Sequence, residues 1–208
     1  DLVRSRGLGD VYKRQIQAQS NIPTDFGMFT VYAFSEYEED WNPHLVWVAE
    51  NTDFSKTVNV RFHSECITGE IFHSKKCECG QQLDAAMKYM SENGGMIIYL
   101  RQEGRNIGMI NKLRAYALQE KGFDTVEANL KLGLPADGRN FDVAVEMLKI
   151  LNVKEINLLT NNPDKLKSLE NSGIILNHRV PLEIESNEVN ESYLSKKKDY
   201  FGHLLEKI

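Results

Sequence analysis

Three cysteines within 14 residues form the most chemically suggestive cluster in this chain. They are Cys66, Cys77 and Cys79, spaced C-x10-C-x-C, and the chain contains no other cysteine. An odd number this close together is a poor basis for a disulfide framework. Zinc takes four protein ligands in structural sites, but three ligands and a water in catalytic ones. The cluster therefore predicts a zinc site with one open position. Two alternatives remain: a closed structural site with His63 or His73 as fourth ligand, and buried thiols acting as small hydrophobic groups.

A polar turn after an apolar strand is the next candidate site. Residues 96–100 (MIIYL) predict a buried strand, and residues 101–108 (RQEGRNIG) then open a helix. Ligands in open α/β sheets bind beyond such carboxyl ends of strands. Arg101 and Arg105 suit an anion, whereas Glu103 suits the amino and N–H donors of a base edge. An ordinary surface turn with ion pairs explains the same residues.

Two further loops carry polar residues at the ends of predicted elements. In residues 134–139 (LPADGR), Asp137 could act as a base and Arg139 as a phosphate ligand. In residues 159–165 (LTNNPDK), Thr160 and Lys165 could reach a phosphate or a base. A solvated ion pair and a helix-capping turn are the alternatives that need no ligand.

The elements that must position these residues follow from apolar patterning. Aromatic and β-branched runs predict strands, and apolar residues at helical spacing predict helices. On the helix 107–121, the apolar positions Ile107, Ile110 and Leu113 form one stripe. Strands are expected at 26–34, 45–49, 58–62, 96–100 and 156–160, and helices after Gly80, at 107–121, at 141–151 and from Pro163. The alternation predicts an α/β fold with a mixed, partly parallel sheet flanked by helices and a β-rich N-terminal part.

The two ends of the chain differ from this pattern. Residues 1–15 are basic and show little apolar periodicity, so we expect a non-native or disordered extension without a role in the fold. Residues 16–208 are expected to form a single domain. Within it, the polar stretch 186–208 is expected to be a helix or tail packed on the outside.

Composition narrows the classes of partner and compartment. The net charge of −5 argues against a nucleic-acid-binding protein, which is usually basic. No apolar run reaches the 18 or so residues of a membrane-spanning helix. Reduced cysteines in a cluster point to the cytoplasm.

Taken together, these segments resemble GTP cyclohydrolase II, an enzyme of riboflavin biosynthesis. The resemblance runs from about Ile22 to Leu205. It rests on 61–69 (RFHSECITG), 77–83 (CECGQQL), 101–108 (RQEGRNIG), 124–129 (DTVEAN), 159–163 (LTNNP) and 200–205 (YFGHLL).

The resemblance implies a reaction and the residues that perform it. GTP would be converted to 2,5-diamino-6-hydroxy-4-(5-phosphoribosylamino)pyrimidine, formate and pyrophosphate, in the first committed step of riboflavin biosynthesis. Zinc on Cys66, Cys77 and Cys79 would supply the water that opens the imidazole ring at C8, and Mg²⁺ would accompany the phosphates. Tyr116 would assist near the ring. The implied GTP contacts are Arg61, Phe62, His63, Ser64, Glu65, Gln82, Glu103, Gly104, Arg105, Thr125, Thr160 and Lys165.

The resemblance also leaves open questions. It implies Asp137 as base and Arg139 as nucleophile at the α-phosphorus, but a guanidinium with a pKa above 12 is a demanding nucleophile. Arg139 could instead stabilise charge on the phosphate. A homodimer is implied, and an upstream dihydroxybutanone-phosphate synthase domain occurs in many relatives. Two other hypotheses are a non-catalytic zinc module that binds nucleotide, and an enzyme that opens the ring without releasing formate.

Overall fold

A single seven-stranded sheet organises the chain. The computed structural model describes residues 14–206, without the side chains of residues 191 and 192. The strand order is β1-β2-β3-β5-β4-β6-β7. Pairing is antiparallel from β1 to β5 and parallel from β5 to β7, so the expected mixed, partly parallel α/β sheet is confirmed. No helix in the described part of the chain is long and apolar enough to cross a membrane.

The antiparallel half contains the β-rich N-terminal region. Its strands are β1 (Gln15–Thr24), β2 (Gly27–Ser35) and β3 (His44–Ala49). β1 was not expected, because an exposed edge strand needs few apolar residues. Residues 1–15 were expected to lack a role in the fold, which is wrong for residues 14 and 15. Gln15 pairs with Ser35 in the sheet, and Arg14 forms a 3.0 Å ion pair with Glu146. Residues 1–13 lie outside the described part.

The parallel half presents its carboxyl ends at one edge of the sheet. It consists of β5 (Met96–Leu100), β4 (Val58–Ser64), β6 (Glu155–Leu159) and β7 (Ile175–Val180). Alternation along β4 sends Val60 and Phe62 into the main apolar core. Arg61 and His63 consequently lie on the opposite face of the sheet, ready to serve a site at its edge.

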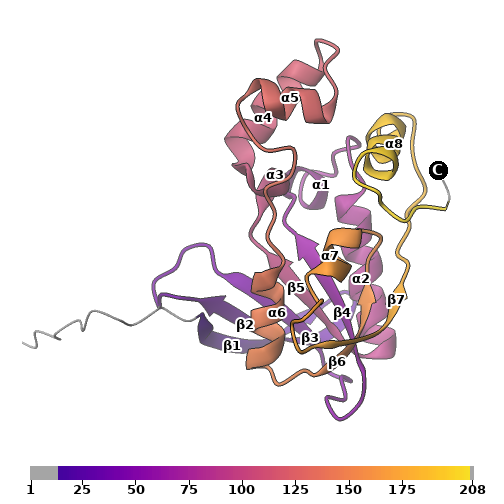
Figure 1. The fold of residues 1–208 in the computed structure, drawn as a ribbon. Helices are drawn as coiled ribbons and strands as arrows, with labels where there is room; N and C mark the ends of the chain where they lie inside the picture. The colour runs from indigo at the N-terminus through magenta and orange to yellow at the C-terminus, as the bar shows by residue number, and fades with distance from the viewer. Residues whose placement is uncertain (1–13, 207–208) are drawn as a thin grey trace, which may run out of the picture.

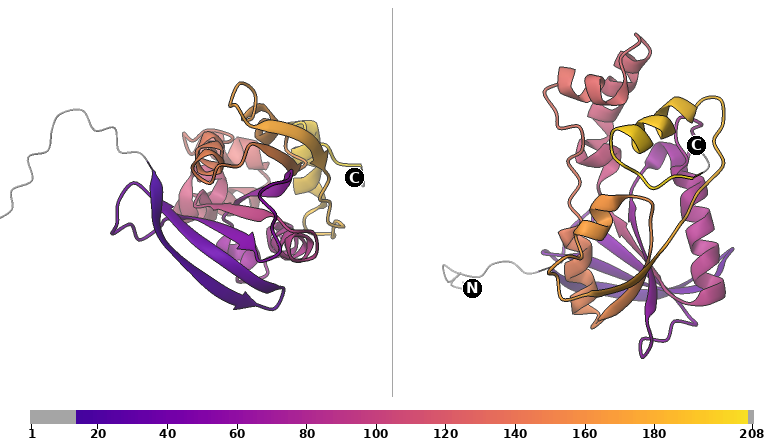
Figure 2. Two further views of the ribbon diagram at one scale, coloured as in Figure 1. Left: turned by 90° about the horizontal axis from the view of Figure 1, so that it is seen from below. Right: turned by 45° about the vertical axis from the view of Figure 1, so that its right-hand side comes forward.

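Helices cover both faces of the sheet (Figure 2). On one face, α2 (Cys79–Asn93) packs Ala86 and Met90 against Phe29 and Ile97. On the other, α6 (Asp142–Ile150) and α7 (Pro163–Lys167) close the larger core. Asn162 caps α7 by accepting a 2.9 Å hydrogen bond from the Asp164 N–H, and Pro163 occupies a first helical position that needs no donor.

The remaining helices stand beyond the carboxyl edge of the strands (Figure 1). They are α1 (Ile67–Glu70), α3 (Glu103–Asn106), α4 (Gly108–Gln119), α5 (Thr125–Lys131) and α8 (Glu191–Asp199). The apolar stripe predicted on α4 does not face the core: Ile110 and Leu113 are 68% and 53% exposed. Lys112 and Ala115 are the buried residues of α4, so this helix turns a polar face inward.

Candidate active site

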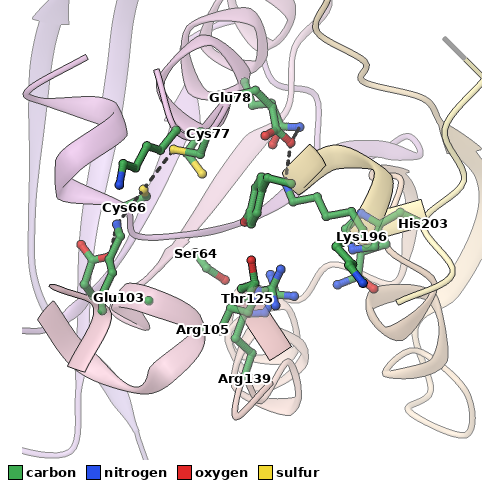
Figure 3. A pocket seen from close by; sticks show the side chains of 18 of the residues that line it. Ser64, Cys66, Cys77, Glu78, Glu103, Arg105, Thr125, Arg139, Lys196 and His203 are labelled. Atoms are coloured by element: carbon green, nitrogen blue, oxygen red, sulfur yellow. Dashed lines mark hydrogen bonds and ion pairs between the residues drawn. The ribbon is translucent and has the colours of Figure 1, made fainter. Parts of the chain in front are cut away.

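A cavity of about 420 Å³ lies beyond the carboxyl ends of β4, β5 and β6, and α4, α5 and α8 contribute to its walls. It brings together segments that are far apart in the sequence (Figure 3). The predicted site residues that line it are Arg61, His63, Ser64, Glu65, Cys66, Cys77, Cys79, Gln82, Glu103, Gly104, Arg105, Tyr116, Thr125, Arg139, Thr160 and Lys165.

Two predicted residues do not line this cavity. The Phe62 side chain is fully buried in the core, and only its carbonyl reaches the site, where it accepts a 2.5 Å hydrogen bond from Lys165 Nζ. Asp137 lines a neighbouring hollow that shares Arg139 with the main cavity. Asp137 is therefore connected to the main cavity only through its ion pair with Arg139.

The three cysteines converge at one end of the cavity. Their sulfur atoms all lie within 4.8 Å of one another, and the Sγ atoms of Cys66 and Cys77 are 3.6 Å apart. Tetrahedral zinc with Zn–S bonds of about 2.3 Å places two sulfurs about 3.8 Å apart, so the thiols fit this ion. A Cβ on Gly69 would lie only 2.9 Å from Cys77 Sγ, which explains a glycine in α1. Within the described part of the chain, no His, Asp or Glu joins the group as a fourth ligand.

A buried lysine neutralises part of this end. Lys112 Nζ donates to Cys66 Sγ at 3.1 Å, to Thr68 Oγ1 at 2.8 Å and to Glu103 Oε1 at 2.7 Å. Hydrogen bonds from the other two thiols, aided by this ammonium, lower the pKa of Cys66 far below its usual range. The bond to Cys66 raises the pKa of Cys77 to about 11. We call Cys66, Cys77, Cys79 and Glu103 the thiol end.

Backbone geometry aims Glu103 into the cavity. Gly104 and Arg105 both adopt left-handed conformations, with φ of 63° and 59°, and so break the helix just after Glu103. Glu103 Oε2 accepts a 2.7 Å hydrogen bond from the Ile67 N–H while Oε1 accepts from Lys112. A carboxylate offers about four lone-pair positions, so both oxygens can still accept from a ligand.

A hydrogen-bond network behind the cysteines orients His63. Its Nε2 lies 2.9 Å from Glu70 Oε1, which also accepts the Cys66 N–H at 2.8 Å. Tyr99 donates to the other Glu70 oxygen at 2.5 Å. Because Arg61 Nε donates to His63 Nδ1, the proton of the imidazole resides on Nε2. Burial lowers the pKa of His63 to about 4, so the ring is neutral near pH 7.

The opposite end of the cavity is cationic. Arg139 pairs with Asp137, donating from Nε to both carboxylate oxygens at 2.9 and 3.1 Å. Burial, followed by the charges of Arg61 and Arg139, lowers the pKa of Lys165 well below its usual range. Arg105 presents a buried Nη1 with no hydrogen-bond partner among the described residues. Such a concentration of positive charge suits a polyanion.

Several residues of the site were not predicted. Lys112 lines the cavity from the face of α4 opposite the apolar stripe. Glu70 and Tyr99 do not line it but support His63 from behind. The C-terminal stretch, expected on the outside, instead lines the cavity with Tyr193, Lys196, Lys197, His203 and Leu205. The sequence suggested no role for His203. We call Arg105, Arg139, Lys165, Lys197 and His203 the cationic end. Figure 3 shows Cys66, Cys77 and Glu103 on one side, and Arg105, Arg139 and His203 across the pocket.

The chain is similar in sequence to proteins of one known family. The family model described as GTP cyclohydrolase II matches residues 14–181. GTP cyclohydrolase-2 of Campylobacter fetus is 50% identical over 189 residues, covering 91% of this chain and 95% of that protein. Riboflavin biosynthesis protein RibBA of Staphylococcus epidermidis is 50% identical over 190 residues, covering 91% of this chain and 48% of that protein. The chain thus spans about half the length of the RibBA relatives it matches.

One solved structure is a more distant likeness. It is RibBX of A. baumannii, a two-domain 3,4-dihydroxy-2-butanone 4-phosphate synthase, with 16% sequence identity and a TM-score of 0.47. The match covers 85% of this chain and 42% of that one, and a likeness of this strength assigns neither fold nor function.

Proposed function

The chain belongs to the GTP cyclohydrolase II family, and from that premise we propose that it converts GTP to 2,5-diamino-6-hydroxy-4-(5-phosphoribosylamino)pyrimidine, formate and pyrophosphate. This is the first committed step of riboflavin biosynthesis. The observation that carries the proposal is the charge arrangement of one cavity. Three thiols lie at one end and several guanidinium and ammonium groups at the other. A purine nucleoside triphosphate has its reacting ring and its phosphates separated in the same way.

The thiol end would hold one zinc ion through Cys66, Cys77 and Cys79. Zinc supplies a Lewis acid and an activated water for hydrolysis at C8 of the base. The absence of a fourth His, Asp or Glu from the group, within residues 14–206, supports an open catalytic site over a closed structural one. Three protein ligands would leave one position of the zinc for water.

Glu103 would recognise the guanine edge. A carboxylate accepts from the N1–H and the 2-amino group together, and adenine offers neither donor in that arrangement. Since the Glu103 side chain is 8% exposed and already anchored by Lys112 and the Ile67 N–H, it is held in place before substrate arrives. A buried polar site of this kind rejects analogues that leave it unpaired.

Tyr116 would act near the ring as proton donor or hydrogen-bond partner. It lines the cavity from α4, and burial raises the pKa of its phenol above the usual value. The phenol therefore keeps its proton at neutral pH and can donate it to a nitrogen of the opening ring.

Asp137 and Arg139 would act at the α-phosphorus. Burial opposes the charge of Arg139, but the hydrogen bonds and the charge of Asp137 outweigh it and raise the pKa of the guanidinium. That pairing supports a charged Arg139 that stabilises the phosphate over a neutral, nucleophilic one. Trapping the enzyme with GTP and searching for a covalent phosphoguanidine by mass spectrometry tests the nucleophilic alternative.

The rest of the cavity would bind the sugar and phosphates of GTP, with Mg²⁺ on the phosphate oxygens. A magnesium ion in such a site keeps several waters and few protein ligands. The proposed contacts are Arg61, Phe62 through its carbonyl, His63, Ser64, Glu65, Gln82, Gly104, Arg105, Thr125, Thr160 and Lys165.

The decisive experiment is to mix the purified protein with GTP, zinc and magnesium and to assay formate and pyrophosphate together. Equal amounts of both products are expected. Pyrophosphate without formate would indicate an enzyme that stops before formate release. Tight GTP binding without either product would indicate a non-catalytic zinc module instead.

We also propose a cytoplasmic homodimer. Three thiols that must stay reduced to bind zinc suit the cytoplasm. The exposed side chains of Ile110 and Leu113 on α4, and of Leu130 on α5, would gain from burial against a second copy. Sedimentation of wild type and of Leu113→Glu tests this proposal, because a charge in the interface would shift the protein toward monomer.

A further inference from the structure

The C-terminal segment, residues 190–205, is built into the wall of the cavity. Leu194 on α8 is 2% exposed, and the Leu204 N–H donates a 2.8 Å hydrogen bond to the carbonyl of Asn161 beside the site. Lys196 forms a 2.9 Å ion pair with Asp124, the residue that caps α5. The segment is therefore fastened both to the sheet edge and to the helical part that closes the site.

Lys197 of this segment adds a positive charge where positive charge is already concentrated, and the neighbouring His203 stays neutral. Burial, Lys197, Arg139, Lys165 and Arg105, in that order, lower the pKa of His203 to about 2. The carboxylates at hand are Glu78, which pairs with Lys197, and Asp137, which pairs with Arg139. Arg105 and Lys165 have no carboxylate partner among residues 14–206. The cationic end thus has more positive than negative groups.

The same segment also fixes the direction of Arg105. The guanidinium of Arg105 lies 4.2 Å from the ring centroid of Phe201 and 5.6 Å from that of Tyr193. These two cation–π contacts help to hold the guanidinium in place, while Nη1 stays buried without a hydrogen-bond partner among residues 14–206. A donor that is oriented but unsatisfied inside a cavity indicates an anionic ligand.

We propose that Lys197 and His203 are phosphate-binding residues, and that the C-terminal segment completes the subsite for the terminal phosphates of the nucleoside triphosphate. This inference rests on the proposed function and adds two ligands to it. The Lys197 ammonium has three donors, and its bond to Glu78 leaves others for phosphate oxygens. A neutral His203 can donate one further N–H.

The test is binding of inorganic tripolyphosphate, which lacks the base, by titration calorimetry. Lys197→Met should weaken its affinity at least about tenfold, as expected for loss of a charged hydrogen bond, and His203→Gln should weaken it about threefold. Lys198→Met is the matched control, since Lys198 is adjacent but does not line the cavity. Its affinity should stay within twofold of wild type, and guanosine affinity should stay unchanged in all three variants.

Unchanged tripolyphosphate affinity in a folded Lys197→Met protein would overturn the proposal. If that variant fails to fold, Lys197→Arg and His203→Gln carry the test: near wild-type affinity in the first with weakened affinity in the second supports the subsite, and wild-type affinity in both overturns it. Tripolyphosphate binding that depends on Lys197 in a protein without GTP turnover would contradict the proposed function only. GTP turnover with an unchanged KM in Lys197→Met would contradict the phosphate subsite only.

Discussion

The thiol end of the cavity contains three thiols and a carboxylate, whereas the cationic end contains basic side chains. At the thiol end, the buried ammonium of Lys112 donates hydrogen bonds to Cys66 and to Glu103. At the cationic end, the carboxylates of Glu78 and Asp137 pair with only two of the five basic groups, Lys197 and Arg139. Burying like charges together is costly unless a ligand of opposite charge joins them. Under the proposed function, a metal cation would supply the opposite charge at the thiol end and a polyphosphate at the cationic end.

The largest effect is expected from Cys79→Ser at the thiol end. Removing one of three ligands should eliminate bound zinc and reduce formate release below detection. That loss exceeds the roughly 10²- to 10³-fold cost of removing one transition-state donor. Part of the attack at phosphorus should survive, because the cationic end is untouched. Zinc content by plasma mass spectrometry, with separate formate and pyrophosphate assays, measures both ends at once.

Equal loss of both products in Cys79→Ser, in a protein that still binds tripolyphosphate, would contradict the separation of the two ends. Chelator-stripped wild type serves as the control, since it lacks zinc but keeps every side chain. Restoring zinc to it should restore formate release.

The corresponding change at the cationic end is Arg139→Lys. Lysine keeps the charge but loses the fork of donors that matches Asp137 and a phosphate. Pyrophosphate release should fall roughly 10²-fold, whereas zinc content should stay at wild-type level. Substantial turnover in this variant would exclude Arg139 as a nucleophile, and reduced zinc content would show that the two ends depend on each other structurally.

The two ends also differ in how far the sequence reveals them. The thiol ligands lie within 14 residues, so their types and spacing alone predicted a metal site. The cationic end combines Arg105, Arg139, Lys165 and the C-terminal segment, whose proximity exists only in the folded chain. Resemblance to a family located some of these residues. Lys197 lies in a polar stretch that was expected to pack on the outside, and the sequence suggested no role for His203.

A similar division applies to the fold. Strands β2 to β6 were predicted close to their observed bounds, because buried strands are apolar and β-branched. The edge strands β1 and β7 were missed, since an exposed edge needs no continuous apolar run. The prediction that the apolar stripe of α4 faces the core was wrong. Its apolar residues Ile110 and Leu113 are exposed, whereas the polar Lys112 is buried.

A smaller effect, on stability, should distinguish buried from exposed cations at the thiol end. Lys112→Met leaves Glu103 buried without its counter-ion, which should lower the free energy of unfolding by about 3–5 kcal/mol. Lys76→Met is the matched control, because the Lys76 ion pair with Glu120 is exposed and worth at most about 1 kcal/mol. Urea unfolding at neutral pH measures both. Equal destabilisation by the two substitutions would show that Lys112 is not holding the Glu103 carboxylate.

The smallest effect is a pH dependence that originates at the cationic end. His203 has a pKa of about 2 when folded, owing to burial and its cationic neighbours, and about 6.5 when unfolded. Below pH 6.5 the His203 imidazole is therefore protonated in the unfolded chain but not in the folded one, so stability falls as the pH falls. Between pH 6.5 and 5, the free energy of unfolding of His203→Gln should therefore fall by roughly 1–2 kcal/mol less than that of the wild type. Chemical denaturation at both pH values measures the difference. Saturating tripolyphosphate should also weaken the pH dependence of the wild type, because an anion beside His203 favours its protonated form. If the free energy of unfolding changes with pH identically in wild type and His203→Gln, the neighbouring cations do not act on this imidazole.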